Sequence, residues 1–205
     1  WREKFAPLNR TVDVYAIGAP ESPEGYVATH YAKGETLTLV DWCALTPAAA
    51  RAINGFAAQH RASWQTVDRF GAPADLLSLL QHDRGWTVRS VEPWLTRVID
   101  VETALAARGW PVGERRQIGL QVDDADLPAN NATFVLSLEN GRAQVSRSQS
   151  SAAVRLTVAA LASLFTGYAT PRLLARAGAL ATNEADLVVL ERLFAGPAPI
   201  LWDTF

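Results

Sequence analysis

The segment from Pro93 to Trp110, which reads PWLTRVIDVETALAARGW, constrains the fold most strongly. Its side chains alternate with a period of two as far as Ile99, which predicts a β-strand. Asp100 then suits the N-cap of a helix, because its carboxylate can accept a hydrogen bond from a backbone N–H of the first turn. Gly109 is expected to end that helix in the left-handed conformation. A strand that leads directly into a short capped helix suggests that one folding unit closes and another opens near mid-chain.

The bulk properties fit a globular chain. Its 205 residues suffice for one large domain or two small ones, and they are 49% hydrophobic and 20% charged. The net charge of -2 gives no electrostatic case for a nucleic acid partner, and no apolar run approaches the ~20 residues that cross a bilayer. The single cysteine, Cys43, excludes an internal disulfide framework and agrees with the cytoplasm. The sequence starts at Trp1 and lacks methionine, so we interpret it as a piece of a longer protein.

The residues before Pro93 predict a mixed sheet with one long helix. Thr46-Pro47 reads as an N-cap followed by proline at the first helical position, and opens a helix to His60. A boundary near Glu92–Pro93 separates residues 1–92 from residues 93–205. The strands expected in this first part are Val12–Ile17, Gly25–Ala32 and Thr36–Trp42 as an antiparallel meander, then Ser63–Phe70 and Trp86–Val91.

Residues 93–205 predict an antiparallel sheet with helices before and after it, so the whole chain is expected to be α+β. Asn140-Gly141 is a strong hairpin signal, because both residues accept a positive φ. Thr157, Thr170 and Asn183 are the expected N-caps of three later helices. The strands expected here are Gln117–Asp123, Ala132–Glu139, Arg142–Arg147 and Val154–Leu156.

Few polar residues suggest chemistry. The spacing of the three histidines, His30, His60 and His82, matches no metal motif, so no metal site is expected. Cys43 reads as a buried small hydrophobe more readily than as a nucleophile. The acidic run Asp123–Asp126 suits either a cation or amine site or, more simply, a solvated loop between strands. The serines between 146 and 151 lack the G-x-S-x-G context of a hydrolase and read as a solvated turn.

The sequence shows no cofactor loop of its own. Walker and G-x-G-x-x-G motifs are absent. The Arg/Gln-x-x-Gly-x-Gly/Ala turn of acetyl-CoA enzymes is also missing, and the nearest string, Arg116–Gln121, has the wrong order.

The tail GPAPILWDTF is too apolar for a frayed end, so Ile200, Leu201, Trp202 and Phe205 are expected to dock into the body. The α-carboxylate of Phe205 would be ionised at neutral pH, and could accept a proton or bind an amine. A tail that simply packs, without chemistry, is the alternative.

The whole chain resembles the C-terminal half of the enhanced intracellular survival family of bacterial GNAT-type N-acetyltransferases. The strings that carry the resemblance are EGYV at 24–27, DWCALTP at 41–47, PWLTRVIDV at 93–101, ALAARG at 104–109, AALASLFTG at 159–167, and the terminal Phe205.

The resemblance implies a protein of three parts. A catalytic GNAT domain that binds acetyl-CoA would lie upstream, so this chain itself would hold no cofactor. Residues 1–92 would be most of a degenerate GNAT-like domain, and residues 93–205 a sterol-carrier-protein-like domain. The family also implies an amine acceptor and a homo-oligomer.

The same resemblance assigns the general base to the α-carboxylate of Phe205. An acidic residue just before the terminal aromatic binds the acceptor in the family, whereas this chain has Thr204 there and Asp203 one step earlier. Asp203 and Trp202 are therefore the acceptor-binding candidates.

Three functions follow, the third of which is an assembly scaffold, because the family forms oligomers. In the first, the chain is the accessory part of an N-acetyltransferase and is inactive alone. In the second, it is a lipid- or acyl-binding module without catalysis, with residues 156–180 lining an apolar cavity. Those residues would equally suffice to fill a core.

Overall fold

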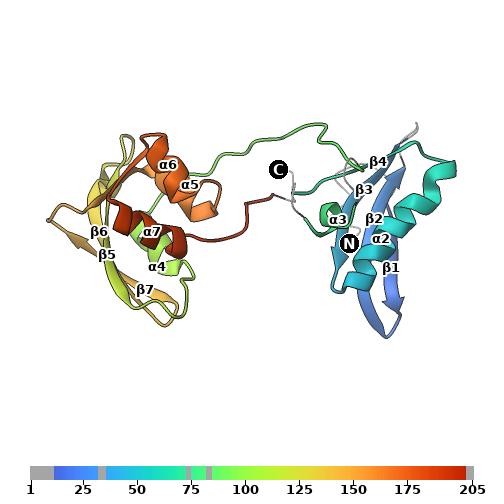
Figure 1. Ribbon diagram of the computed structural model, residues 1–205, viewed down its shortest axis with the longest axis horizontal. Coiled ribbons are helices and arrows are strands. Elements are labelled where there is room, and N and C mark those ends of the chain that lie inside the picture. Colours follow the sequence, from blue (N-terminus) through green and yellow to red (C-terminus); the bar gives the residue numbers. More distant parts are fainter. Residues whose placement is uncertain (1–11, 32–35, 73–74, 82–84, 202–205) are drawn as a thin grey trace. The chain divides into compact units, whose positions relative to one another are not determined.

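The computed structural model describes residues 12–31, 36–72, 75–81 and 85–201 (Figure 1). They form two compact units. Unit 1 runs to Val91 and includes Ile200 and Leu201, and unit 2 runs from Glu92 to Pro199. Each unit has its own hydrophobic core.

Unit 1 is a four-stranded mixed sheet with one long helix on it. The first three strands are antiparallel, whereas β4 runs parallel to β3, so the order is β1-β2-β3-β4. Helix α2 makes the crossover between the two parallel strands, as such a connection requires. The elements are β1 (Val12–Ala19), β2 (Ser22–Tyr31), β3 (Thr36–Ala44), α2 (Pro47–Gln59), η2 (His60–Ala62), β4 (Thr66–Arg69) and α3 (Leu76–Leu79).

The core of unit 1 lies between α2 and one face of this sheet. Its buried members are Val27, Leu37, Leu39, Ala50, Ile53 and Leu77. Gly25 allows both β3 and α2 to come this close. A Cβ there would lie 2.4 Å from the Cys43 carbonyl oxygen of β3 and 3.3 Å from Ala49 Cβ of α2. Only a residue without a side chain fits under the first turn of α2.

Two strands expected from the sequence are not formed. Residues 85–99, which include the predicted strand Trp86–Val91 and the alternating segment up to Ile99, run without strand pairing or helix before Asp100. A strand needs a partner edge to satisfy its backbone, and none of the described strands pairs with these residues in a sheet. The alternation of their side chains therefore did not predict a place in either sheet correctly.

Unit 2 is a five-stranded sheet in the order β7-β6-β5-β8-β9. The expected antiparallel sheet was wrong in one respect, since β8 runs parallel to β5 and makes the sheet mixed. The reason is the connection through residues 149–153, which carries the chain past β6 and β5 instead of turning it back as a hairpin. The strands are β5 (Arg116–Asp123), β6 (Ala132–Glu139), β7 (Arg142–Ser148), β8 (Val154–Thr157) and β9 (Leu180–Ala181).

The helices of unit 2 begin at the predicted caps. The side chains of Asp100, Thr157, Thr170 and Asn183 each accept a backbone N–H of the following helix. Helix α4 ends with Arg108 in an extended conformation (φ −64°, ψ 140°), so the expected left-handed Gly109 was wrong. The helices are α4 (Val101–Ala107), α5 (Val158–Thr166), α6 (Pro171–Arg176) and α7 (Glu184–Leu193), with η3 (Pro128–Asn130) between β5 and β6.

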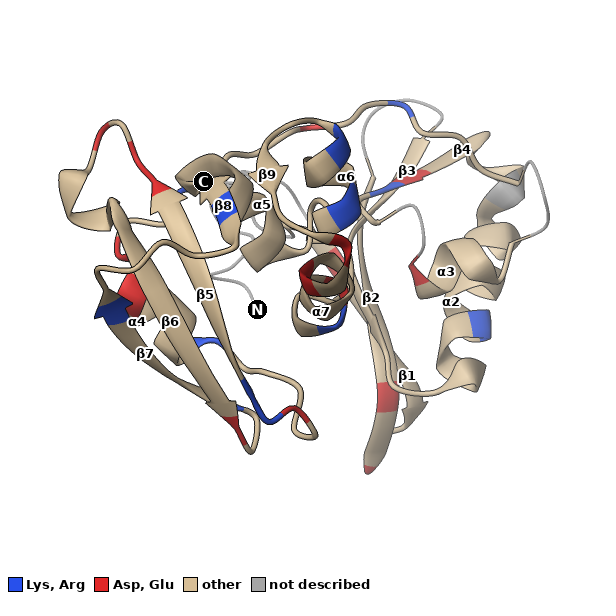
Figure 2. Ribbon diagram, turned by 60° about the vertical axis from the view of Figure 1, so that its left-hand side comes forward, with Lys and Arg blue, Asp and Glu red and all other residues tan. Residues whose placement is uncertain are grey.

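Alternation along the strands sends one face of this sheet into the core. Ile118, Leu120 and Val122 of β5 are buried, whereas Gln117 and Asp123 are exposed. The β6–β7 hairpin closes at Asn140 and Gly141, with φ of 51° and 77°, as the sequence predicted. Helix α7 starts with acidic residues and carries Arg192 in its last turn, charges that suit the helix dipole (Figure 2).

The loop after β5 contains a buried carboxylate. Asp124 is 2% exposed and accepts hydrogen bonds from Asn130 Nδ2 (2.8 Å), Arg97 Nη2 (2.6 Å), and the backbone N–H groups of Asp126 and Leu127 (3.1 Å each). These bonds, led by that from Asn130, lower the pKa of Asp124 to about 2. The expectation of a solvated acidic loop was therefore wrong for Asp124, although Asp126 remains exposed.

Asn130 extends this network to the start of α4. It accepts a hydrogen bond from the Val101 N–H (3.3 Å) and donates one to the Ile99 carbonyl oxygen (3.1 Å). Arg97 also pairs with Asp126 at 3.0 Å. Segment 97–101 is thus fixed to unit 2 by polar contacts that compensate the burial of one charge.

The Gly25 contact predicts a large effect from one methyl group. Gly25→Ala places a Cβ against a backbone oxygen and is expected to destabilise unit 1 by about 1–3 kcal/mol. Gly55→Ala is the matched control, because Gly55 lies inside α2 with nothing within 4 Å of its Cβ position, and it should gain up to about 1 kcal/mol. Thermal unfolding measures both, and equal midpoints for the two variants would contradict the packing argument.

The buried carboxylate predicts an acid-sensitive unit 2. The folded pKa of Asp124 lies below its unfolded value of about 3.9, so its contribution is present above that value and is lost as the pH falls toward 2. Asp124→Asn should lower stability at pH 7 and flatten the dependence between pH 5 and pH 2. Hydrogen exchange in α4 and β5 reports this. Asp126→Asn, whose side chain is 76% exposed, should change little.

Candidate functional site

The N-terminus of α2 is the position in unit 1 where a phosphate group would be expected. It follows β3 directly and precedes a strand parallel to β3. Free N–H groups and the positive end of the helix dipole make such a terminus a ready site for phosphate. We call this place the α2 corner and define it by Glu24, Gly25, Thr46, Pro47 and Ala49.

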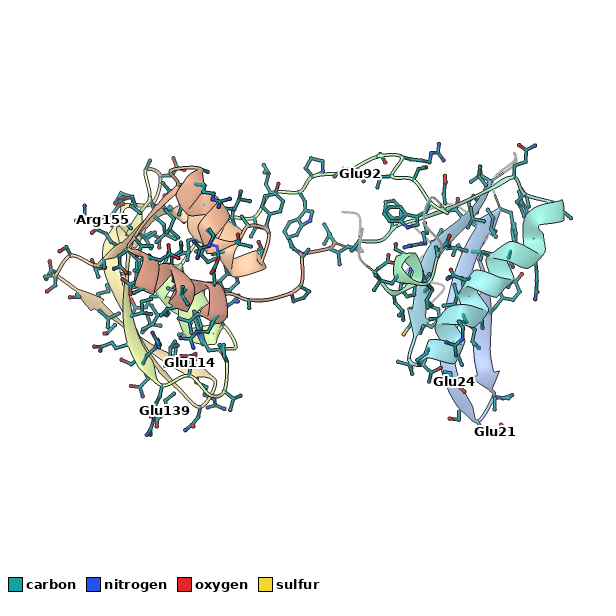
Figure 3. All side chains as sticks on the ribbon, in the orientation of Figure 1. Glu21, Glu24, Glu92, Glu114, Glu139 and Arg155 are labelled. Carbon is teal, nitrogen blue, oxygen red and sulfur yellow. The ribbon has the colours of Figure 1, made fainter. Side chains whose placement is uncertain are left out.

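Side chains of the protein itself occupy the α2 corner. Thr46 Oγ1 accepts the Ala49 N–H at 3.1 Å and donates to Glu24 Oε2 at 2.5 Å. The Leu45 N–H donates to the Glu24 carbonyl oxygen at 2.8 Å. Pro47, the first helical residue, has no N–H to offer. Figure 3 shows Glu24 at the end of the sheet where α2 begins. A carboxylate therefore lies where a phosphate would need to bind.

The opposite face of the sheet carries a second polar group. Val40 is an extra residue in β3, since Ala28 pairs with Asp41 and Thr29 with Leu39. Tyr26 donates its hydroxyl hydrogen bond to Asp41 Oδ2 at 3.1 Å. Burial, and then the Asp41 charge, raises the pKa of Tyr26 to about 12. Tyr26 therefore stays protonated at neutral pH and acts as a hydrogen-bond donor.

The α2 corner explains two of the sequence strings noted above. Residues 24–27 supply the carboxylate and the close-packed Gly25, and residues 41–47 supply Asp41 and the Thr46-Pro47 cap. The Thr46-Pro47 cap was predicted from local spacing. The role of Glu24 was not, because its partner lies 22 residues away.

The remaining candidates do not form a second centre. His30 lies in β2 and His60 in η2, while His82 lies outside the described residues. Cys43 is partly exposed in β3. Among the described residues, no group of three or more His, Cys, Asp or Glu side chains is placed to hold a metal ion. Nor does any helix in the described ranges have the length and apolar character needed to span a bilayer.

The tail is only partly described. Trp202, Asp203 and Phe205, the acceptor-binding and general-base candidates, lie outside the described residues. Residues 195–201 have neither helix nor strand. Ile200 is half-buried, whereas Leu201, which was expected to dock, is 39% exposed.

The described surface of unit 2 includes two cavities of a size that could hold a ligand. One of about 300 Å³ is lined mainly by small and polar residues of β5, β6 and the loop 148–154, and one of about 730 Å³ runs along α4 beside Asp100, Glu102 and Arg147. Residues 156–180 line neither of them. Most of their apolar side chains lie in the core instead, with Leu156, Leu161, Leu164, Leu174 and Leu180 all buried, whereas Tyr168 and Leu173 are exposed.

Arg108 is a further polar residue that the sequence did not single out. Its guanidinium carbon lies 5.0 Å from the ring centre of Phe194 and 5.4 Å from those of Trp110 and Phe165. Nη1 donates to the Phe165 carbonyl oxygen at 2.5 Å. Burial lowers the pKa of Arg108. Its contacts join the end of α4 to α5 and α7, so we interpret it as structural.

Comparison with protein families divides the chain in two. Residues 1–98 match the acetyltransferase (GNAT) domain family, and residues 101–202 match the sterol carrier protein domain family. The sequence predicted a degenerate GNAT-like domain in residues 1–92 and a cofactor-binding GNAT domain upstream, and the match shows a GNAT-family domain at residues 1–98 of this chain.

Relatives are described as N-acetyltransferases. An uncharacterized N-acetyltransferase of Streptomyces griseus is 36% identical over 163 residues, which cover 73% of this chain and 38% of the relative. A GCN5-related N-acetyltransferase structure from Anabaena variabilis is 32% identical with a TM-score of 0.91, and covers 98% of this chain and 54% of its own. Eis1 from Mycobacterium abscessus is 27% identical with a TM-score of 0.73, covering 99% and 53%.

The chain thus spans about half the length of the matched structures and less of the curated relative. Within that span the two family matches follow one another almost without overlap or gap. The chain therefore joins a domain of the acetyltransferase (GNAT) family to a sterol carrier protein domain.

Proposed function

We propose that this chain is the non-catalytic part of an acetyl-CoA-dependent N-acetyltransferase, and that its GNAT-family domain does not bind acetyl-CoA. The occupied α2 corner is the observation that carries the proposal. A cofactor pyrophosphate needs free N–H donors at a helix N-terminus. Here Pro47 offers none, and Thr46 already uses the Ala49 N–H.

Charge acts in the same direction. The Glu24 carboxylate, held 2.5 Å from Thr46 Oγ1, brings a negative charge to the terminus where the pyrophosphate would add more. Two negative charges close together repel, and the Glu24 carboxylate already complements the helix dipole. The residues present therefore do not fit the cofactor, and we assign no reaction step to it in this chain.

The remainder of the reaction centre belongs, in this proposal, to a longer parent protein. The matched structures extend well beyond the aligned half and are described as N-acetyltransferases. The likeness to Eis1 supports an Eis-like family. We infer that the acetyl-CoA-binding domain lies in that remainder, that the acceptor is an amine, and that the parent forms a homo-oligomer.

The family resemblance further assigns a general base to the α-carboxylate of Phe205, with Asp203 and Trp202 beside the acceptor. Measurements of acetyl transfer by the full-length parent are needed to test these three candidates. The lipid-binding alternative gains no support from the core, because most apolar side chains of residues 156–180 pack in it and none of these residues lines either cavity.

Acetyl-CoA is expected to leave this chain unchanged. A ligand present at 100 times its dissociation constant would stabilise the protein by about 2.7 kcal/mol, a shift of several degrees in the unfolding midpoint. We expect no shift with acetyl-CoA at ~1 mM, against a clear shift for the full-length parent. A midpoint that rises with acetyl-CoA in this chain alone would refute the proposal.

The terminal carboxylate is tested by a one-residue extension. A glycine added after Phe205 in the full-length parent moves the carboxylate by up to about 3.6 Å and should lower kcat at unchanged midpoint. A glycine inserted after Gly113, in an open turn, is the matched control. Normal turnover of the extended protein would remove the base from Phe205 and leave the cofactor argument intact.

A further inference from the structure

Among the described residues of unit 1, more large apolar side chains are exposed than belong to its core. Eight of them, all between β4 and the end of the unit, are 40% to 79% exposed, whereas its core buries five of comparable size. The exposed set is Val67, Phe70, Leu76, Leu79, Leu80, Trp86, Val88 and Val91. Large exposed apolar side chains that gather in one part of a domain often mark an interaction surface.

The sheet of unit 1 ends where this set begins. Strand β4 has only four residues, pairs in parallel with β3, and is the last strand in the order β1-β2-β3-β4. Parallel sheets are normally covered on both faces. Within the described ranges no further strand pairs with β4, so its outer backbone groups are open to another strand.

Residues 85–91 have the pattern of the missing strand. Trp86 and Val88 alternate with Thr87 and Arg89, and the segment is neither helical nor paired. An ion pair joins Arg89 Nη1 to Asp68 Oδ2 of β4. This ion pair links the segment to β4. The two charges neutralise one another, so they add no net charge to the surrounding surface.

We propose that β4, α3 and residues 85–91, here called the β4 face, form the docking surface for the acetyl-CoA-binding part of the parent protein, and that residues 86–91 become a paired β-strand when it docks. The occupant is argued from length and chemistry. The Anabaena variabilis structure aligns with 98% of this chain yet has nearly half of its own length outside the alignment. The β4 face is apolar, so it fits a folded protein surface. This inference rests on the function proposed above.

Hydrogen exchange of the full-length parent, compared with this chain alone, tests the proposal. Backbone amides of residues 86–91 should exchange at least 100-fold more slowly in the parent, because a paired strand protects them and a bare one does not. Leu79→Glu and Val88→Glu in the parent should each reduce that protection at least tenfold. Both side chains are exposed in this chain, so the same substitutions should leave its own unfolding midpoint unchanged.

Val112→Glu and Val14→Glu are the matched controls. Val112 is 77% exposed in unit 2, and Val14 is 48% exposed on β1 at the other edge of the same sheet. Neither should alter exchange at 86–91. Equal exchange in parent and chain, or protection that survives both β4-face substitutions, would overturn the docking surface. So would protection that appears in this chain alone as its concentration rises, which would identify a second copy as the occupant. Acetyl-CoA binding by this chain would instead overturn the proposed function, so the two failures are distinguishable.

Discussion

The hydrogen bond between Thr46 and Glu24 closes the N-terminus of α2, and the functional interpretation of unit 1 depends on it. The same bond explains why the cap is strong: the threonine oxygen receives the Ala49 N–H while its own proton goes to a carboxylate. A helix terminus completed in this way contributes to stability and has little left to offer a ligand. A GNAT-family domain can therefore keep its crossover between parallel strands and still lack a phosphate site.

Local features were predictable from the sequence, and features set by distant partners were not. Asp100, Thr46 and Thr157 cap their helices as expected, because each needs only a backbone N–H three residues on. The parallel pairing of β8 was missed, since a strand's direction depends on which edge the chain reaches. Asp124 was misjudged for the same reason: its burial requires Arg97, 27 residues earlier.

The candidate site divides along the same line. Its helical half, Thr46-Pro47, follows from composition and spacing, whereas Glu24 could be recognised only as part of a family string. Gly25 is informative in retrospect, because a glycine inside a strand often marks a close approach of another backbone. The segment 86–91 shows the converse error. Its alternation was real, but a strand also needs a partner, and no described strand supplies one.

The occupied α2 corner and the unpaired segment 86–91 are physically related. At the α2 corner the Ala49 N–H and the Thr46 hydroxyl already have partners, and in the proposed function this leaves that end of the domain with little affinity for an anion. The groups of the domain that can still form interactions are the exposed apolar side chains and the backbone edge of β4, which no described strand pairs. Exposed apolar area and an open strand edge favour binding to another protein surface, because such a surface can bury the apolar side chains and pair with the strand. In the proposed function, unit 1 therefore holds a catalytic neighbour in place, and the chemistry occurs elsewhere in the parent protein.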